Sequence, residues 1–175
     1  MDPWVWVVIA VVVLAVLALV IVQLLRQRKA QEKFGPEYDR SVKETGSRRQ
    51  AVSELRQREQ RRQELDIQPL EPEAAERYSA SWKEAQARFV DFPGEAIREA
   101  DGLVSQVMKD RGYPVENFEQ RSSDISVDHP QLVDDYRAAH AISMANDNGQ
   151  ATTEDLRQAM VHYRSLFDEL LETKR

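Results

Sequence analysis

An unbroken apolar stretch near the N-terminus constrains this chain more than any other feature. Residues 4–22 read WVWVVIAVVVLAVLALVIV, and nine of these nineteen residues are valine. With Pro3 and Leu24–Leu25 the stretch has about 20 residues, which match a hydrocarbon core of roughly 30 Å at about 1.5 Å per residue. In lipid a lone strand would leave its backbone polar groups unpaired, so the valines do not prevent a helix. The sequence therefore predicts one transmembrane anchor over residues 1–25.

A cleaved signal peptide is the main alternative for this segment. Such a peptide has a positively charged start, a shorter apolar stretch and a cleavage site of small residues. Here the start is Met1-Asp2, and Arg26-Gln27-Arg28-Lys29 follows the apolar stretch in place of small residues. We therefore interpret the segment as an anchor that stays in the membrane.

The basic residues beside the apolar stretch predict its orientation. Four of them follow it, and none precedes it: Arg26, Arg28, Lys29 and Lys33. Loops rich in lysine and arginine stay on the cytoplasmic side of a membrane. We therefore expect the N-terminus outside, the remaining chain in the cytoplasm, and the protein in the inner (plasma) membrane.

Charge divides the rest of the 175-residue chain into a basic and an acidic part. Residues 26–62 carry 12 basic and 6 acidic side chains, a net charge of +6, and residues 63–175 carry 12 and 23, a net charge of −11. We expect a solvated basic stalk over residues 26–66. Its alternative role is to bind anionic lipid headgroups, first through Arg26, Arg28, Lys29 and Lys33 and further along through Arg48, Arg49, Arg56, Arg58, Arg61 and Arg62. No aromatic residues interleave with these arginines, so nucleic acid is not an expected partner.

Hydrophobic periodicity predicts helices throughout the remaining chain. A short helix is expected over Pro36–Thr45, and a very polar one from a Ser47 cap to about Leu65. The Ile67–Pro72 segment breaks the chain, and beyond it apolar residues recur at three or four positions within about 75–89, 97–108, 133–144 and 156–171. The predicted fold is all-α: a transmembrane helix, a charged helical stalk, and an acidic antiparallel helix bundle over residues 67–175.

One connection in the expected bundle is unusually long. Residues 112–130 contain only a possible short helix, and Asp128 is expected to cap the helix that Pro130 opens. Long connections in compact domains are often functional, and the aromatic and apolar residues here predict that this one is ordered. We assign to it a candidate protein-binding surface made of Tyr113, Phe118, Arg121, Asp128 and His129.

Several strings in the chain resemble those of a family of uncharacterised single-pass membrane proteins from bacteria, which have a cytoplasmic helical domain. The strings are FGPEYDRSV (34–42), ARFVDFP (87–93), RGYPVENFEQRSSDISVDHP (111–130), YRAAHAI (136–142) and TEDLRQAMVHYRSLFDELL (153–171). The resemblance covers nearly all of the chain beyond the anchor. It implies an anchor followed by a helical domain, and it brings no established activity or catalytic residue.

Known catalytic patterns are missing from the sequence. There is no cysteine, no glycine-rich loop after a strand and no G-x-S-x-G motif. Asp128 and His129 would be the first pair to suspect in an enzyme or a metal site, but they fit a helix start more simply. We therefore expect no enzyme, no metal and no cofactor. The leading hypothesis is a membrane-tethered adaptor or scaffold that binds an unidentified protein; the alternatives are an anionic-membrane sensor and an enzyme that uses Asp128 and His129.

Overall fold

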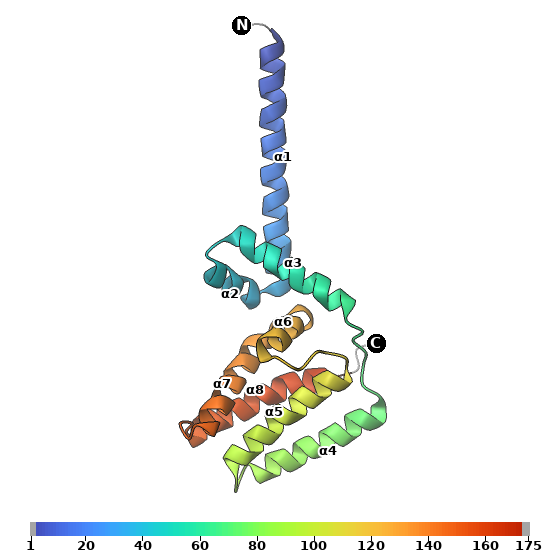
Figure 1. The fold of residues 1–175 in the computed structure, drawn as a ribbon, viewed down its shortest axis with the longest axis vertical. Helices are drawn as coiled ribbons and strands as arrows, with labels where there is room; N and C mark the ends of the chain where they lie inside the picture. The colour runs from blue at the N-terminus through green and yellow to red at the C-terminus, as the bar shows by residue number, and fades with distance from the viewer. Residues whose placement is uncertain (1–2, 173–175) are drawn as a thin grey trace. The chain divides into compact units, whose positions relative to one another are not determined.

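The computed structural model describes residues 3–172, and within them it contains eight helices and no strand (Figure 1). The predicted all-α class is therefore confirmed for this part of the chain; the first two residues of the expected anchor lie outside it. The helices are α1 (Pro3–Phe34), α2 (Pro36–Thr45), α3 (Arg48–Glu64), α4 (Pro72–Arg88), α5 (Pro93–Asp110), α6 (Phe118–Asp128), α7 (Val133–Asp147) and α8 (Thr153–Leu171).

The chain forms two compact units, Met1–Arg56 and Gln57–Arg175. The division falls inside α3, so the last two turns of this helix belong to the second unit. The Ile67–Pro72 break, where the sequence predicted the start of the bundle, also lies in the second unit.

Helix α1 dominates the first unit. Its segment Trp6–Phe34 is 29 residues long and apolar enough to cross a membrane, and the most apolar window of the segment buries none of its residues within the protein. Because a membrane anchor and a signal sequence share these properties, the structure establishes one candidate spanning helix near the N-terminus.

Two glycines separate the short helix α2 from its neighbours. Gly35 has a φ of 49° and Gly46 a φ of 67°, and the left-handed backbone of Gly46 ends α2 by donating from its N–H to the Val42 carbonyl at 3.0 Å. Glycine reaches positive φ without the steric cost that a Cβ imposes. The bounds predicted for this helix, Pro36–Thr45, are confirmed.

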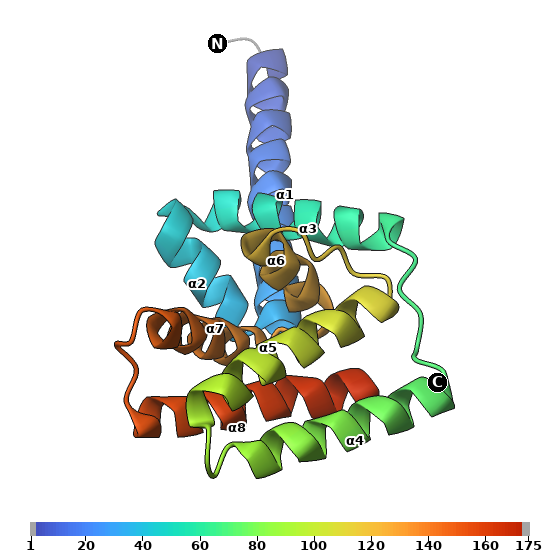
Figure 2. The same cartoon turned by 60° about the horizontal axis from the view of Figure 1, so that its bottom comes forward.

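The second unit is built around four amphipathic helices. Helix α5 packs on α4 and α8, and α8 packs on α7, while α6 packs on α7 (Figure 2). The stripes predicted from the periodicity supply most of the core: Leu70, Ala74, Trp82, Ala96, Ile97, Ala100, Val104, Val107, Met108, Tyr113, Ile125, Val133, Tyr136, Ala139, Leu156, Ala159, Met160, Tyr163, Leu166, Phe167 and Leu170. Thr152 and Asp155 form a capping box at the start of α8, with both reciprocal hydrogen bonds.

The connection over residues 112–130 is ordered and packed, as predicted, but its helix is longer than the possible short one, because α6 takes up most of it. Asn117 caps this helix by accepting a hydrogen bond from the Gln120 backbone N–H at 3.2 Å. Asp128 is the last residue of α6, and α7 begins at Val133 with no side-chain cap. The predicted role of Asp128 as an N-terminal cap is therefore wrong. Serine and aspartate, which favour turns over helix interiors, concealed α6 in the sequence.

Candidate functional site

A polar cluster lies inside the second unit where α5, α7 and α8 meet. Its centre is the Asp101 carboxylate, which accepts a hydrogen bond from the Tyr163 hydroxyl at 2.7 Å and lies 3.5 Å from Nδ1 of His140. Burial alone would raise the pKa of Asp101, but the His140 ring and the Tyr163 hydroxyl outweigh it and hold that pKa below its usual value. The carboxylate is therefore ionised at neutral pH and joins three helices.

Arg121 of α6 extends the same cluster. Its side chain is only 7% exposed, and its guanidinium lies over the rings of Phe118 and Tyr136, 5.5 and 5.7 Å from their centroids. The Phe118 ring in turn stacks on His140, with centroids 3.7 Å apart. Cation–π contacts are stronger when the cation is desolvated. Arg121 and Phe118 therefore fasten α6 to the interior of the unit.

We predict that replacing Asp101 by asparagine weakens the unit and flattens its response to acid. The folded pKa of Asp101 lies below its unfolded value of about 3.9, so its contribution is fully present above about pH 4 and is lost as pH falls through the folded value. Removing the charge should cost about 1–3 kcal/mol at neutral pH. Denaturation followed by circular dichroism at several pH values checks this.

Asp147 provides the matched control for that experiment. It pairs with Arg98 at 3.4 Å, but both side chains are about half exposed. Exposed pairs contribute about 0–1 kcal/mol, so Asp147→Asn should change stability little. An equal loss in the two variants would contradict the special role of Asp101.

Asp128 and His129, the pair suspected of acid–base chemistry, have separate partners in the structure. The Asp128 carboxylate accepts hydrogen bonds from the Tyr113 hydroxyl at 2.5 Å and from Nε of Arg62. His129 places Nδ1 3.3 Å from Oε1 of Glu169 on α8. Burial, with the Asp128 hydrogen bond, raises the pKa of the Tyr113 hydroxyl, which stays protonated and donates. Both residues therefore link α6 to other elements of the unit.

Three arginines in the last turns of α3 face α6. Arg58 donates to the Ser126 hydroxyl at 3.4 Å, Arg61 lies 3.2 Å from the Asp124 carboxylate, and Arg62 pairs with Asp128. Residues three and four apart share one helix face, so one face of α3 meets the C-terminal end of α6. These three arginines, which the sequence offered as possible headgroup ligands, have partners within the protein.

The predicted protein-binding residues lie together but are largely interior. Tyr113 is 3% exposed and Arg121 7%, and Phe118 and His129 are partly buried. Asp128 reaches the surface most, with its side chain 25% exposed. Their role in binding a protein stays a prediction, and the structure gives them packing partners within the fold.

Each of the three histidines lies beside a carboxylate. Besides the His140–Asp101 and His129–Glu169 pairs, Nδ1 of His162 on α8 lies 3.1 Å from Oδ1 of Asp135 on α7. Among residues 3–172, no group of three or more histidine, aspartate and glutamate side chains is placed to hold a metal ion. Each histidine therefore pairs with a carboxylate from another helix of the second unit.

Exposed apolar side chains, which sequence reasoning missed, lie in the turn between α4 and α5 and in the last turn of α7. Val90 and Phe92 in the turn between α4 and α5 are 82% and 57% exposed, and Met144 in the last turn of α7 is 52% exposed. The side chain of Asn146 donates to the Gly94 carbonyl at 3.0 Å, which holds the end of α7 beside the start of α5. The turn falls between the helical stripes predicted over residues 75–89 and 97–108, but the sequence did not predict that its aromatic residue would stay in solvent.

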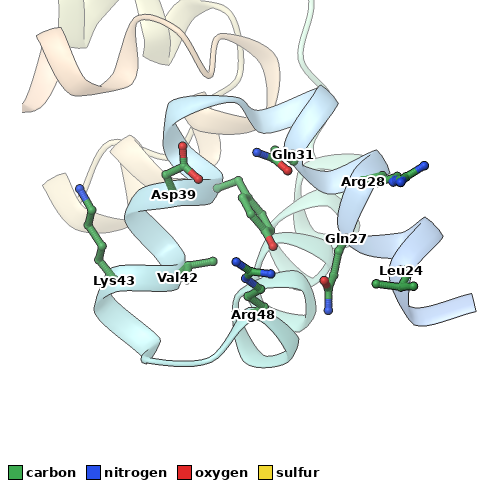
Figure 3. A pocket seen from close by; sticks show the side chains of 9 residues that line it. Leu24, Gln27, Arg28, Gln31, Asp39, Val42, Lys43 and Arg48 are labelled. Atoms are coloured by element: carbon green, nitrogen blue, oxygen red, sulfur yellow. The ribbon is translucent and has the colours of Figure 1, made fainter. Parts of the chain in front are cut away.

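A pocket lies in the first unit between α1 and α2, near the end of the apolar part of α1. Its volume is about 490 Å³, and its lining includes side chains from α1, α2 and the start of α3 (Figure 3). Of the predicted headgroup ligands, Arg28 and Arg48 are among the lining residues; Lys33 instead lies 5.5 Å from the centroid of the Phe34 ring. The lining residues are Leu24, Gln27, Arg28, Gln31, Tyr38, Asp39, Val42, Lys43 and Arg48.

Comparisons with known proteins assign no family, fold or function to this chain. No family model, no curated protein and no solved structure matches the chain. The resemblance to uncharacterised bacterial single-pass proteins therefore stays a prediction.

Proposed function

We propose that this chain is a membrane-tethered, non-enzymatic adaptor whose second unit binds a protein partner in the cytoplasm. Helix α1 would span the inner membrane with its N-terminus outside, and the basic residues after it support this orientation. Helices α4, α5, α7 and α8 would act as an antiparallel bundle that presents one binding surface. Helix α1 is long and apolar enough for this role.

The observation that carries the proposal is the pair of exposed apolar side chains in the turn between α4 and α5, Val90 and Phe92. Single exposed apolar residues are ordinary, but neighbouring large ones mark an interaction site. These two stand two residues apart in one turn, and the Asn146–Gly94 hydrogen bond ties the start of α5, just after it, to the end of α7. An aromatic side chain in this setting is a typical anchor for a partner.

The charges around this surface favour a basic, amphipathic partner segment. Arg88 and Arg98 are already paired with Glu99 and Asp147. The carboxylates of Asp91 and Glu95 are exposed, and neither has an ion pair within residues 3–172. A helix with apolar residues on one side and lysine or arginine beside them would complement both features.

Site-specific photocrosslinking in cells tests the proposal. A photoreactive amino acid at position 92 should give one discrete crosslinked product, and sequencing of that product should show a basic amphipathic segment. Val90→Asp should abolish the product, because a carboxylate on this surface is costly to desolvate beside apolar side chains. The helical content of the variant should be unchanged, since Val90 is 82% exposed.

Val161 supplies the matched control, since it is 51% exposed on α8 and does not belong to the α4–α5 turn. A photoreactive amino acid at position 161 should give no crosslinked product. Val161→Asp should leave the product from position 92 unchanged. A crosslink from position 92 only to another copy of this chain, or none at all, would refute the adaptor function.

A further inference from the structure

The turn between α7 and α8 contains an asparagine followed directly by a glycine. Asn148 comes after the last residue of α7, and Gly149 is next in the chain. Both residues are exposed, and a Cβ added at Gly149 would meet nothing within 4 Å. The turn joins the two helices at the left of Figure 2. Water therefore reaches the side-chain amide of Asn148 and the peptide bond that follows it.

An asparagine in this position can react with its own backbone. The backbone nitrogen of Gly149, once it has lost its proton, attacks Cγ of Asn148 and closes a succinimide ring, and the side-chain nitrogen leaves as ammonia. Water then adds to one of the two ring carbonyls and breaks the bond from that carbonyl to nitrogen, which gives aspartate or isoaspartate. Water is consumed, ammonia is released, and nothing is oxidised or reduced. A glycine favours the attack because it has no Cβ beside the attacking nitrogen.

The other asparagines of the chain lack this combination. The sequence contains three asparagines: Asn117, Asn146 and Asn148. Asn117 is followed by Phe118 and Asn146 by Asp147, so a Cβ stands beside each attacking nitrogen. The side chains of Asn117 and Asn146 also have fixed roles, as the N-terminal cap of α6 and as the link from α7 to α5. The reaction is therefore favoured at one position only.

The folded turn holds the two reacting groups apart. The Gly149 N–H donates to the Asn146 carbonyl at 2.9 Å, and the side-chain amide of Asn148 donates to the Met144 carbonyl at 2.9 Å. The attack requires both hydrogen bonds to break, because the nitrogen must lose its proton and reach Cγ. The end of α7 must therefore open before the ring closes, and local opening of a helix end is a common motion of folded proteins.

We propose that Asn148 is a site of spontaneous covalent modification, at which the protein is converted slowly to isoaspartate and aspartate. The product cannot donate to the Met144 carbonyl. Its carboxylate lies beside Asp147 at the C-terminal end of α7, where the helix dipole disfavours negative charge and the last turn has no basic residue. Isoaspartate also lengthens the backbone between α7 and α8 by one carbon atom. This site goes beyond the adaptor function, because it needs no partner and lies outside the α4–α5 turn.

Incubation of the purified full-length chain in detergent at neutral pH tests the site. Peptide mapping by mass spectrometry with electron-transfer fragmentation locates each deamidated asparagine and separates aspartate from isoaspartate. We expect isoaspartate as the main product at position 148. Its rate of formation should exceed the rates at positions 117 and 146 by about tenfold or more, because only Gly149 leaves the attacking nitrogen uncrowded.

Two controls separate the chemistry from the fold. Asn148→Gln keeps an amide at this position but lengthens the side chain, so ring closure is less favourable and no deamidation should be found at residue 148. The original chain in guanidinium chloride should deamidate at Asn148 several-fold faster than the folded chain, because the end of α7 no longer holds the Gly149 nitrogen.

Two results would overturn the proposal. Deamidation at position 148 no faster than at positions 117 and 146 would show that this turn is not a preferred site. Equal rates at position 148 in the folded and the denatured chain would show that the end of α7 does not control the reaction.

Discussion

Replacing Phe167 by alanine is expected to lower the free energy of unfolding of the second unit by about 3–5 kcal/mol. Phe167 is 1% exposed, and its ring stacks on that of Trp82 with centroids 4.4 Å apart and planes 20° from parallel. This contact joins α8 to α4, so alanine removes the transfer free energy of the ring and leaves a cavity between two helices. Since small domains are stable by about 5–15 kcal/mol, this is the largest effect that we predict.

Denaturation of the full-length chain in detergent, followed by far-ultraviolet circular dichroism, measures this loss. Val161→Ala on the same helix is the control, because Val161 is 51% exposed and should change stability by less than about 0.5 kcal/mol. A Phe167→Ala midpoint equal to that of the original chain would show that the Trp82–Phe167 stack is not part of the stable core.

The sequence predicted best those helices whose periodicity and end residues lie within the helix itself. The apolar stripe of α8 is local, and it was predicted correctly. The bounds of α2 followed from Pro36 and Gly46, which begin and end it for steric reasons. Periodicity depends on residues a few positions apart, so it needs no knowledge of the tertiary fold.

Helix α6 shows why the 112–130 segment could not be predicted in the same way. Its buried residues include Ser122, Asp124 and Ser126, which weaken any hydrophobic stripe. Asp124 lies against Arg61, which is distant in sequence. A polar residue that is buried because of a distant partner looks like a surface residue in the sequence, so the segment was interpreted as a connection with at most a short helix.

The candidate sites were harder to predict than the helices because each depends on distant contacts. Tyr113 and Arg121 were chosen as surface residues, yet each is buried by groups that the sequence does not place beside it. The pocket likewise requires the turns at Gly35 and Gly46, which return Arg48 towards α1. The sequence offered Arg28 and Arg48 as candidate headgroup ligands, but not Lys43, which lines the same pocket.

Gly112→Ala is expected to destabilise the second unit by about 2–4 kcal/mol. Gly112 has a φ of 99°, which side chains rarely adopt, and a Cβ added there would lie 2.3 Å from the backbone oxygen of Asp66. The two segments approach closely because the Gln68 N–H donates to the Arg111 carbonyl at 2.9 Å. Alanine therefore adds backbone strain of about 1–3 kcal/mol and pushes apart a backbone contact that contributes about 1 kcal/mol.

The same substitution at Gly102 should have the opposite sign. Gly102 lies within α5, and a Cβ there would meet nothing within 4 Å. Alanine should stabilise the helix by about 0.5–1 kcal/mol, because it loses less backbone entropy on folding than glycine. Parallel denaturation of the two variants measures both changes in stability. Gly102→Ala gives the general effect of replacing a glycine, and Gly112→Ala gives the effect of disturbing the close approach of residues 66–68 to residues 111–113. Similar midpoints for both would mean that this close approach is not held in the folded protein.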